Sequence, residues 1–558
     1  MKDRQQHTRT RPKLKGYLWL TAVLAAAWLG FVGFIDYKAQ VDNVNIHDIG
    51  PALHWGLASI FGVLGMVYGV HWWANAVANE KAELAAYKAT VMAQNEEHRA
   101  TYQRTYALEI RGTGLAVHGW HQSSIWELIQ RKNDNFSSIY SRDPKDYKAS
   151  VTTRDIIQST AIRAAFKYSA GNAVAYWPIP TFAIAPPKQP EDTGASSNIL
   201  SGRNAATLGV TLFLWQDAEN TTHAQGMIER LFAFFDDNSK PPLALIISRD
   251  GDVTRSAYRV PGTPGLQNVH VVPTVFESMT GLLVARSDRV ERYLRPYATD
   301  TRENNQDKTS DLGKLWAFYW KHTTASRKVY EAQERAKGAK NPVGPGTMST
   351  AYWQSQLPSL WQTLSNRGPG YFEPSPWLPV RWARHQLKEF DTSPVLGYLH
   401  RPIKVPMHDE QGKRFKPALR AKALQAGWLE ALATLPEGDQ PVRVFYDSTD
   451  NTDGEIALTN ALHALNTDGH GLELGNVDEG YDIGRRLGNT GVSSALVQIN
   501  LATIASYQDG GVSAVVYAGA DGSLSVQMVR PPDQARKAKN QETRGVDPFM
   551  FGAPGPRA

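Results

Sequence analysis

The chain has 558 residues, which is enough for two or more domains with cores of their own. It contains no cysteine, so disulfides, thiolate catalysis, zinc–thiolate sites and iron–sulfur clusters are excluded. The net charge of +6 is concentrated at the ends: residues 1–15 carry six Lys or Arg and one Asp, residues 530–558 carry six Lys or Arg and three acids, and the remainder has a charge of about −2. This distribution argues against a nucleic-acid binder, whose basic surface would lie in the folded part.

Two long uncharged runs lie near the N-terminus, at residues 16–35 and 49–79. A helix that rises about 1.5 Å per residue crosses the roughly 30 Å hydrocarbon layer with 20 residues. We therefore expect two transmembrane helices within residues 16–78, joined by a short periplasmic loop. The basic tail, residues 1–15, should stay in the cytoplasm by the positive-inside rule. A cleaved signal peptide is the alternative for the first run, and a buried core helix for the second.

Small residues occur in both runs and are expected to let the two helices pack closely. They are Ala25, Ala26, Ala27, Gly30 and Gly33 in the first run and Gly62, Gly65 and Gly69 in the second. Residues 79–105 contain no Pro or Gly and are rich in Ala, Glu and Lys, so they predict a helical connector that continues into the cytoplasm.

The soluble part predicts an α/β protein with two modules. In the first α/β domain, residues 106–298, the runs 208–215 and 243–248 are typical of buried strands and flank an amphipathic helix, which predicts a βαβ unit. A polar linker (299–311) and an aromatic-rich, mainly helical middle region (312–436) lead to the second α/β domain, 437–530. Similar spacing around Trp215 and Tyr446 suggests that the domains are duplicates. The polar segment 531–558 is expected to be a disordered tail.

No complete catalytic motif is present. The pattern Gly-x-Ser-x-Gly is absent, and "GVSSA" (491–495) and "YSAGN" (168–172) come closest to it. His118 and His121 are one helical turn apart, but no third metal ligand follows at a suitable spacing. We therefore expect no catalytic residue, no cofactor and no metal.

The segment 376–402, "PWLPVRWARHQLKEFDTSPVLGYLHRP", is dense in Trp, Arg and His. Pro379 suits the first turn of a helix, and apolar residues then recur on one face while basic residues gather on another. A solvated charged face is one interpretation, and a docking surface for an acidic partner or an anionic membrane is the other. The candidate partner-binding residues are Trp377, Arg381, Trp382, Arg384, His385 and Lys388.

The sequence "PSPWLPVRWARHQLKEFDTSPVLGYLHRPIKVP" (374–406), with "KLWAFYWKH" before it, resembles the type VI secretion lipase-adaptor family of Gram-negative bacteria. The resemblance runs from about residue 100 to 530 and includes the order of the segments. It implies a non-enzymatic adaptor that binds a phospholipase-type effector in the cytoplasm and helps to bring it to the secretion spike protein. The hydrophobic hairpin would then hold the adaptor at the bacterial inner membrane, with the folded domains on the cytoplasmic side.

The alternative function is an α/β hydrolase, similar to a lipase or esterase, with a non-standard active site. A membrane-tethered nucleic-acid binder is a third class, and the acidic middle of the chain argues against it.

Overall fold

The structure is a computed structural model that describes residues 12–42, 49–186, 194–216, 224–257, 259, 264–300, 305–338 and 346–549, apart from the side chains of residues 83, 84 and 86–104. The chain divides into two compact units, Met1–Tyr102 and Gln103–Ala558.

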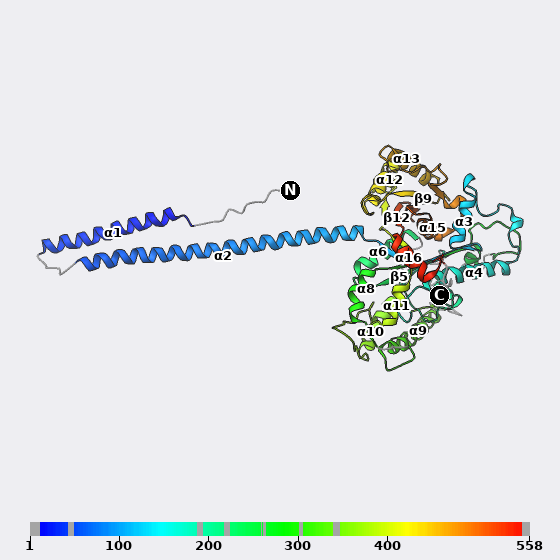
Figure 1. Ribbon diagram of the computed structural model, residues 1–558, viewed down its shortest axis with the longest axis horizontal. Coiled ribbons are helices and arrows are strands. Elements are labelled where there is room, and N and C mark those ends of the chain that lie inside the picture. Colours follow the sequence, from blue (N-terminus) through cyan, green and yellow to red (C-terminus); the bar gives the residue numbers. More distant parts are fainter. Residues whose placement is uncertain are drawn as a thin grey trace. The chain divides into compact units, whose positions relative to one another are not determined.

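The first unit is a hairpin of two long helices, α1 (Leu14–Val41) and α2 (Gly50–Thr105), which lie side by side in Figure 1. The most apolar 18-residue windows within Leu14–Val41 and Gly50–Ala82 have mean hydropathies of 2.1 and 1.5, and both helices are long and apolar enough to cross a membrane. Their large apolar side chains are mostly exposed, including Trp19, Phe34 and Trp55. Helix α2 continues unbroken through the predicted connector, residues 79–105.

Aromatic side chains join α1 to α2. The Tyr17 hydroxyl is 2.5 Å from Nδ1 of His71, and the Tyr17 ring meets Tyr68 edge-on at 5.2 Å. Gly56 lies directly under the Trp28 ring. The predicted glycine packing is wrong, because a Cβ added at any of five of these glycines would meet no atom within 4 Å; they are Gly30, Gly33, Gly62, Gly65 and Gly69.

The second unit contains one mixed sheet of twelve strands, counted over the described residues. The strands are β1 (Leu108–Val117), β2 (Trp120–His121), β3 (Pro178–Ile184), β4 (Leu212–Trp215), β5 (Leu243–Asp250), β6 (Ser278–Ala285), β7 (Gly397–Leu399), β8 (Ile403–Val405), β9 (Pro441–Tyr446), β10 (Gly480–Asp482), β11 (Val512–Ala518) and β12 (Leu524–Arg530).

The helices of this unit are α3 (Ser123–Arg131), α4 (Val151–Ala170), α5 (Gly194–Ala205), α6 (Ala224–Asp237), α7 (Asp252–Ala257), α8 (Ser287–Tyr293), α9 (Asp311–Ala336), α10 (Thr350–Trp361), α11 (Arg384–Thr392), α12 (Pro417–Leu432), α13 (Thr452–Asn466), α14 (Ile483–Leu487), α15 (Ser494–Asp509) and α16 (Gln534–Arg544).

The sheet consists of two halves with the same strand order. The first half runs β4-β3-β5-β6-β1 and the second runs β10-β9-β11-β12-β7. In each half the first two pairings are parallel and the next two are antiparallel. The halves meet where β1 pairs with β7 in antiparallel register, with Glu109 opposite Tyr398. The predicted duplication is therefore present as a repeat of topology.

The repeat is placed differently from the prediction. The sequence spacing equated the β4–α6–β5 segment with β9–α13, whereas the strand order makes β9 the counterpart of β3 and β10 that of β4. In addition, β4 and β5 are parallel but lie on either side of β3. Periodicity identifies strands, but it does not tell which strand inserts between two others.

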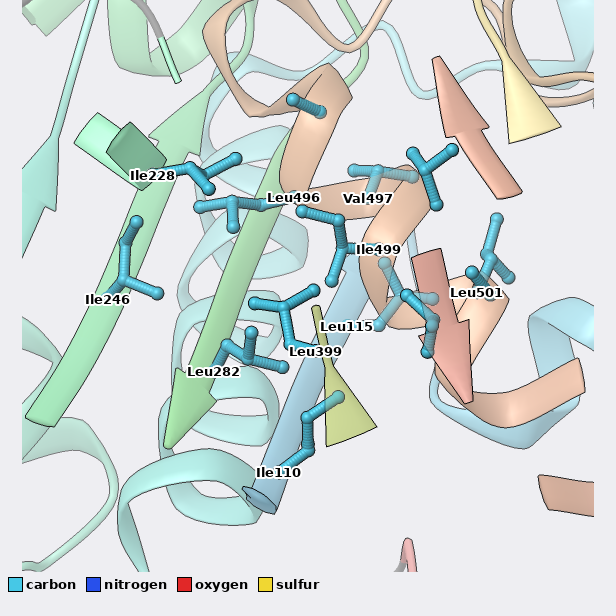
Figure 2. Close-up of a cluster of buried hydrophobic side chains, with 14 of the residues drawn as sticks. Ile110, Leu115, Ile228, Ile246, Leu282, Leu399, Leu496, Val497, Ile499 and Leu501 are labelled. Carbon is cyan, nitrogen blue, oxygen red and sulfur yellow. The ribbon is translucent and has the colours of Figure 1, made fainter. Parts of the chain in front are cut away.

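Helix α15 is the central helix of the fold, because every residue from Ala495 to Tyr507 is buried. Its side chains share one cluster with α6 and with strands of both halves, including Ile110 and Leu282 of the first and Leu399 of the second. Figure 2 shows Leu282 and Leu399 lying beside the α15 side chains Leu496 and Ile499. A helix that is apolar around most of its circumference needs such cover on all sides.

The outer faces of the halves are covered by different helices. Helix α4 packs closely on β1 and β6, because a Cβ at Gly114 would lie only 2.0 Å from the Ala165 carbonyl oxygen. Helices α12 and α13 share a separate apolar cluster with β9, β11 and β12 of the second half.

The aromatic middle region does not form a layer of its own. Its helices α9 and α10 contribute Leu315, Tyr319 and Trp353 to the outer cluster of the first half. Strands β7 and β8, which lie before residue 437, already belong to the second half of the sheet. The structural division between the modules thus falls between α11 and β7.

The prediction of a disordered tail from residue 531 is wrong for residues 531–549. They contain α16, in which Asn540 is buried, followed by a segment that ends with the buried Phe549. Low hydropathy misled the prediction, because a few well-placed contacts hold this polar segment.

Candidate functional site

Helix α11 lies at the centre of the predicted docking segment. It begins at Arg384, five residues after the predicted start, because the preceding residues are extended and pair with Thr299. The Gln386 side chain accepts a hydrogen bond from the Ala383 N–H at 3.1 Å and so closes the first turn. Leu387 and Phe390 face the core.

Three of the six predicted docking residues are buried, which contradicts their predicted role as contact residues. Trp382 has no exposed surface, and its ring meets Trp177 edge-on at 5.5 Å. Trp377 is 7% exposed and its indole N–H donates to Asn238 Oδ1 at 2.9 Å.

Arg381 is the third buried residue, and its guanidinium organises the neighbouring loop. It is 6% exposed, and burial lowers its pKa. It donates to the Asn366 amide oxygen and to the carbonyl oxygens of Tyr297, Pro369 and Gly370. Because residues 380–383 precede α11 and are not helical, Arg381 does not lie on the helical stripe with the other basic residues.

The other three predicted residues, Arg384, His385 and Lys388, are exposed on α11. Arg384 and Lys388 line an open groove of about 560 Å³. The groove also has apolar walls from Leu387, Pro296 and Pro369; the remaining lining residues are Arg295, Ala298, Asp300 and Asp391.

The charges of the groove are largely balanced. Arg295 donates to both carboxylate oxygens of Asp391, at 2.7 and 3.1 Å, and also to both oxygens of Glu291. These two carboxylates raise the pKa of Arg295. Arg384 is ion-paired with Asp300. Among the described residues neither His385 nor Lys388 takes part in an ion pair, so these two exposed side chains remain available to a partner.

Sequence reasoning missed the acidic side of this groove. Arg295 and Asp300 belong to the stretch 295–300, which folds against α11, whereas Asp391 lies on α11 itself. The charges were visible in the sequence, but no periodicity connects residue 295 with residue 391.

Ser169, Ser494 and His118, which belong to the motifs tested for catalysis, make contacts within the fold. Ser169 donates to the Ala165 carbonyl oxygen at 2.8 Å within α4. Ser494 donates to the Asp447 carboxylate, whose pKa burial raises. His118 lies among aromatic rings, and burial lowers its pKa; the rings are those of Tyr140, Tyr147 and Phe276. Over the described part of the chain, no group of three or more His, Asp or Glu residues is placed to hold a metal ion.

Two family models match the chain. Residues 106–269 match the N-terminal model of the type VI lipase adapter protein Tla3, and residues 396–531 match its C-terminal model. Together these ranges include more than half of the 558 residues. The first match lies in the first half of the sheet and the second match spans β7 to β12, so the region between them, which contains the groove, lies outside both models.

Several solved structures are similar at low identity. The ishigamide ketosynthase/chain length factor is 10% identical, with a TM-score of 0.36 over 76% of this chain and 100% of that one. A ketosynthase from module 1 of the bacillaene synthase from Bacillus amyloliquefaciens FZB42 is 8% identical, with a TM-score of 0.38 over 77% of each chain. Cerulenin-bound OleA of Xanthomonas campestri is 11% identical, with a TM-score of 0.33 over 77% of this chain and 98% of that one. At these TM-scores no argument about function rests on the likeness.

Proposed function

The chain belongs to the type VI lipase adapter (Tla3) family, and from this membership we propose that it is a non-enzymatic adaptor that holds a phospholipase-type effector and helps to load it onto the type VI secretion machinery. The observation that carries the proposal is that the two family matches fall on the two halves of one continuous sheet. The secretion spike protein is the proposed recipient of the effector.

The groove along α11 is the proposed contact surface for the effector. All of its lining residues lie between 295 and 391, outside both family matches, so the groove is a feature added to the shared framework. Its apolar walls suit a protruding side chain, and Lys388 in its lining favours an acidic residue of the partner. Trp382 packs against Phe390 of α11, and Arg381 donates to the carbonyl oxygen of Pro369 in the groove lining, so these two residues support this surface from inside.

A charge-reversal experiment tests the proposed surface. His385→Glu combined with Lys388→Glu should weaken binding of the purified full chain to a lipase encoded by a neighbouring gene by at least tenfold, measured by biolayer interferometry. Lys422→Glu, an exposed change on α12 of the second half, is the matched control and should leave binding unchanged. Equal affinities of the double variant and the control would reject α11 as the contact surface, and no affinity in the unaltered chain for any such lipase would reject the adaptor proposal.

We further propose that the α1–α2 hairpin anchors the chain in the inner membrane, with the second unit in the cytoplasm. The support is the hydropathy of the two helices and the positive charge of residues 1–15. Because the chain has no cysteine, single cysteines report topology directly. A membrane-impermeant maleimide should label Asp42→Cys in intact spheroplasts, and Lys148→Cys only after lysis. Labelling of Lys148→Cys before lysis would overturn this topology.

A further inference from the structure

The end of the described chain, Val546 to Phe549, lies against the first half of the sheet. Helix α16 follows the last strand of the second half and is held by Asn540, whose amide pairs with both the N–H and the C=O of Val395. Beyond it, Val546 is 94% exposed, whereas Phe549 is only 2% exposed. Because Phe549 is buried only three residues after a fully exposed Val, its aromatic ring must occupy a specific binding position.

The Phe549 ring occupies the main hydrophobic cluster of the fold. It meets the ring of Tyr507, near the end of α15, edge-on at 5.2 Å. Aromatic rings prefer this edge-to-face arrangement, which adds to the gain from burial.

Gln122 links Phe549 to the open edge of β1. The pairing of β1 with β7 ends at Ile110, so the strand beyond that point needs other partners. The Gln122 side chain supplies them, since its oxygen accepts from the Leu115 N–H and its Nε2 donates to the Thr113 carbonyl oxygen, both at 2.8 Å. The same Nε2 donates to the Phe549 carbonyl oxygen at 2.7 Å.

Gln122 is fully buried, and its backbone has a φ of +52°, which is a conformation that glycine adopts more readily. Without Phe549, one donor of this buried amide would lack its partner, at a substantial desolvation cost. The Gln122 side chain therefore forms hydrogen bonds with the C-terminal segment as well as with β1.

Asp547 makes the third contact. Helix α3 begins at Ser123, and its N-cap residue, Gln122, provides no side-chain cap. The Ser123 hydroxyl donates to Asp547 Oδ2 at 2.6 Å, which places a carboxylate beside the positive end of the helix dipole. The other carboxylate oxygen accepts from the Phe549 N–H at 3.0 Å and fixes the spacing between the two side chains.

We propose that the pocket formed by Gln122, Ser123 and Tyr507 is a peptide-binding site for an Asp-Pro-Phe segment, and that the chain's own residues 547–549 occupy it in cis as a clasp between the two halves. The site recognises a carboxylate, a backbone carbonyl and an aromatic ring at fixed separations. The proposal does not depend on the adaptor function.

A peptide-binding experiment tests this site. The probe is a fluorescent, C-terminally amidated peptide of residues 543–549, and its binding is measured by fluorescence polarisation. The receptors are the intact chain and a full-length Asp547→Asn/Phe549→Ala variant, in which α16 is retained. The peptide should bind the variant at least tenfold more tightly than the intact chain, because the cis segment no longer competes.

Peptide variants provide the matched controls. Replacing Phe549 by Ala or Asp547 by Asn in the peptide should weaken binding at least tenfold, whereas replacing the exposed Val546 by Ala should leave it unchanged. Equal binding to both receptors, or no binding to a folded variant, would overturn the proposal. If the double variant does not fold, a chain that ends at Gly545 replaces it as receptor.

Two further results decide the outcome if neither the double variant nor the shortened chain folds, or if residues 547–549 of a second copy fill the site. As single substitutions in the full-length chain, Phe549→Ala should lower the midpoint of thermal unfolding and Val546→Ala should not. Equal midpoints for the two variants would reject the clasp. Light scattering should show no dimer that depends on residues 546–549, since such a dimer would assign the site to a second copy instead.

Discussion

The two halves of the sheet share one strand order, and the groove along α11 lies on the first half. Residues 299–392 add α9, α10 and α11 to the outer cluster of the first half, whereas α12 and α13 contribute to the corresponding cluster of the second. The strand framework repeats, and the insertion supplies a new surface. The comparison directs the search for a partner-binding surface to residues 299–392, which have no counterpart in the strand repeat.

Removing a large side chain beneath the groove tests whether the added helices are part of the first half. Trp382→Ala leaves a cavity next to Trp177 and should lower the free energy of unfolding by about 3–5 kcal/mol. Denaturant unfolding of the full chain, followed by circular dichroism, measures this. Trp120→Ala, at a position that is 45% exposed, is the control and should cost less than about 1 kcal/mol. A loss of similar size in both variants would contradict the inferred packing of the insertion.

The two halves should also respond to pH in opposite ways. In the first half, burial raises the pKa of Glu277 to about 7, although the Val253 N–H and the Thr254 hydroxyl oppose the shift. The unfolded carboxyl has a pKa of about 4.3, so the folded state binds more protons between these values and stability falls as the pH rises, by a total on the order of 3 kcal/mol. Glu277→Gln should remove this slope in unfolding measurements from pH 4.5 to 7.5. An unchanged slope would show that Glu277 is ionised in the folded state.

His400 of the second half provides the opposite slope. Burial and the nearby Arg530 lower its pKa to about 4, and its Nδ1 lies 2.8 Å from the Thr434 carbonyl oxygen. The unfolded imidazole has a pKa of about 6.5, so stability is lost as the pH falls from 6.5 towards 4, again by on the order of 3 kcal/mol. His400→Asn should remove this acid-side loss. If the variant loses stability below pH 6.5 as steeply as the parent, His400 is not the responsible group.

Local sequence patterns predicted individual elements well. The apolar runs correspond to α1 and to the first part of α2, and the βαβ pattern corresponds to β4, α6 and β5. These predictions succeeded because hydrophobic periodicity and length are properties of contiguous residues. The family resemblance was confirmed by matches to both halves.

The six predicted docking residues differ in their exposure. Arg384, His385 and Lys388 are exposed as expected, whereas Trp377, Arg381 and Trp382 are buried. The helical periodicity failed because Trp382 and Arg384 pair with the backbone of Thr299, which keeps the preceding residues extended. Nothing near Arg381 in the sequence indicates this distant partner.

The sequence by itself determined the apolar helical hairpin, the strands and helices of an α/β fold, and the absence of any cysteine chemistry. Only the tertiary structure decided which strands pair, which half carries the insertion, and that Phe549 is buried beside Tyr507. The physical reason is that propensity and periodicity act over neighbouring residues, whereas burial and hydrogen-bond satisfaction depend on segments hundreds of residues apart, as Gln122 and Phe549 are.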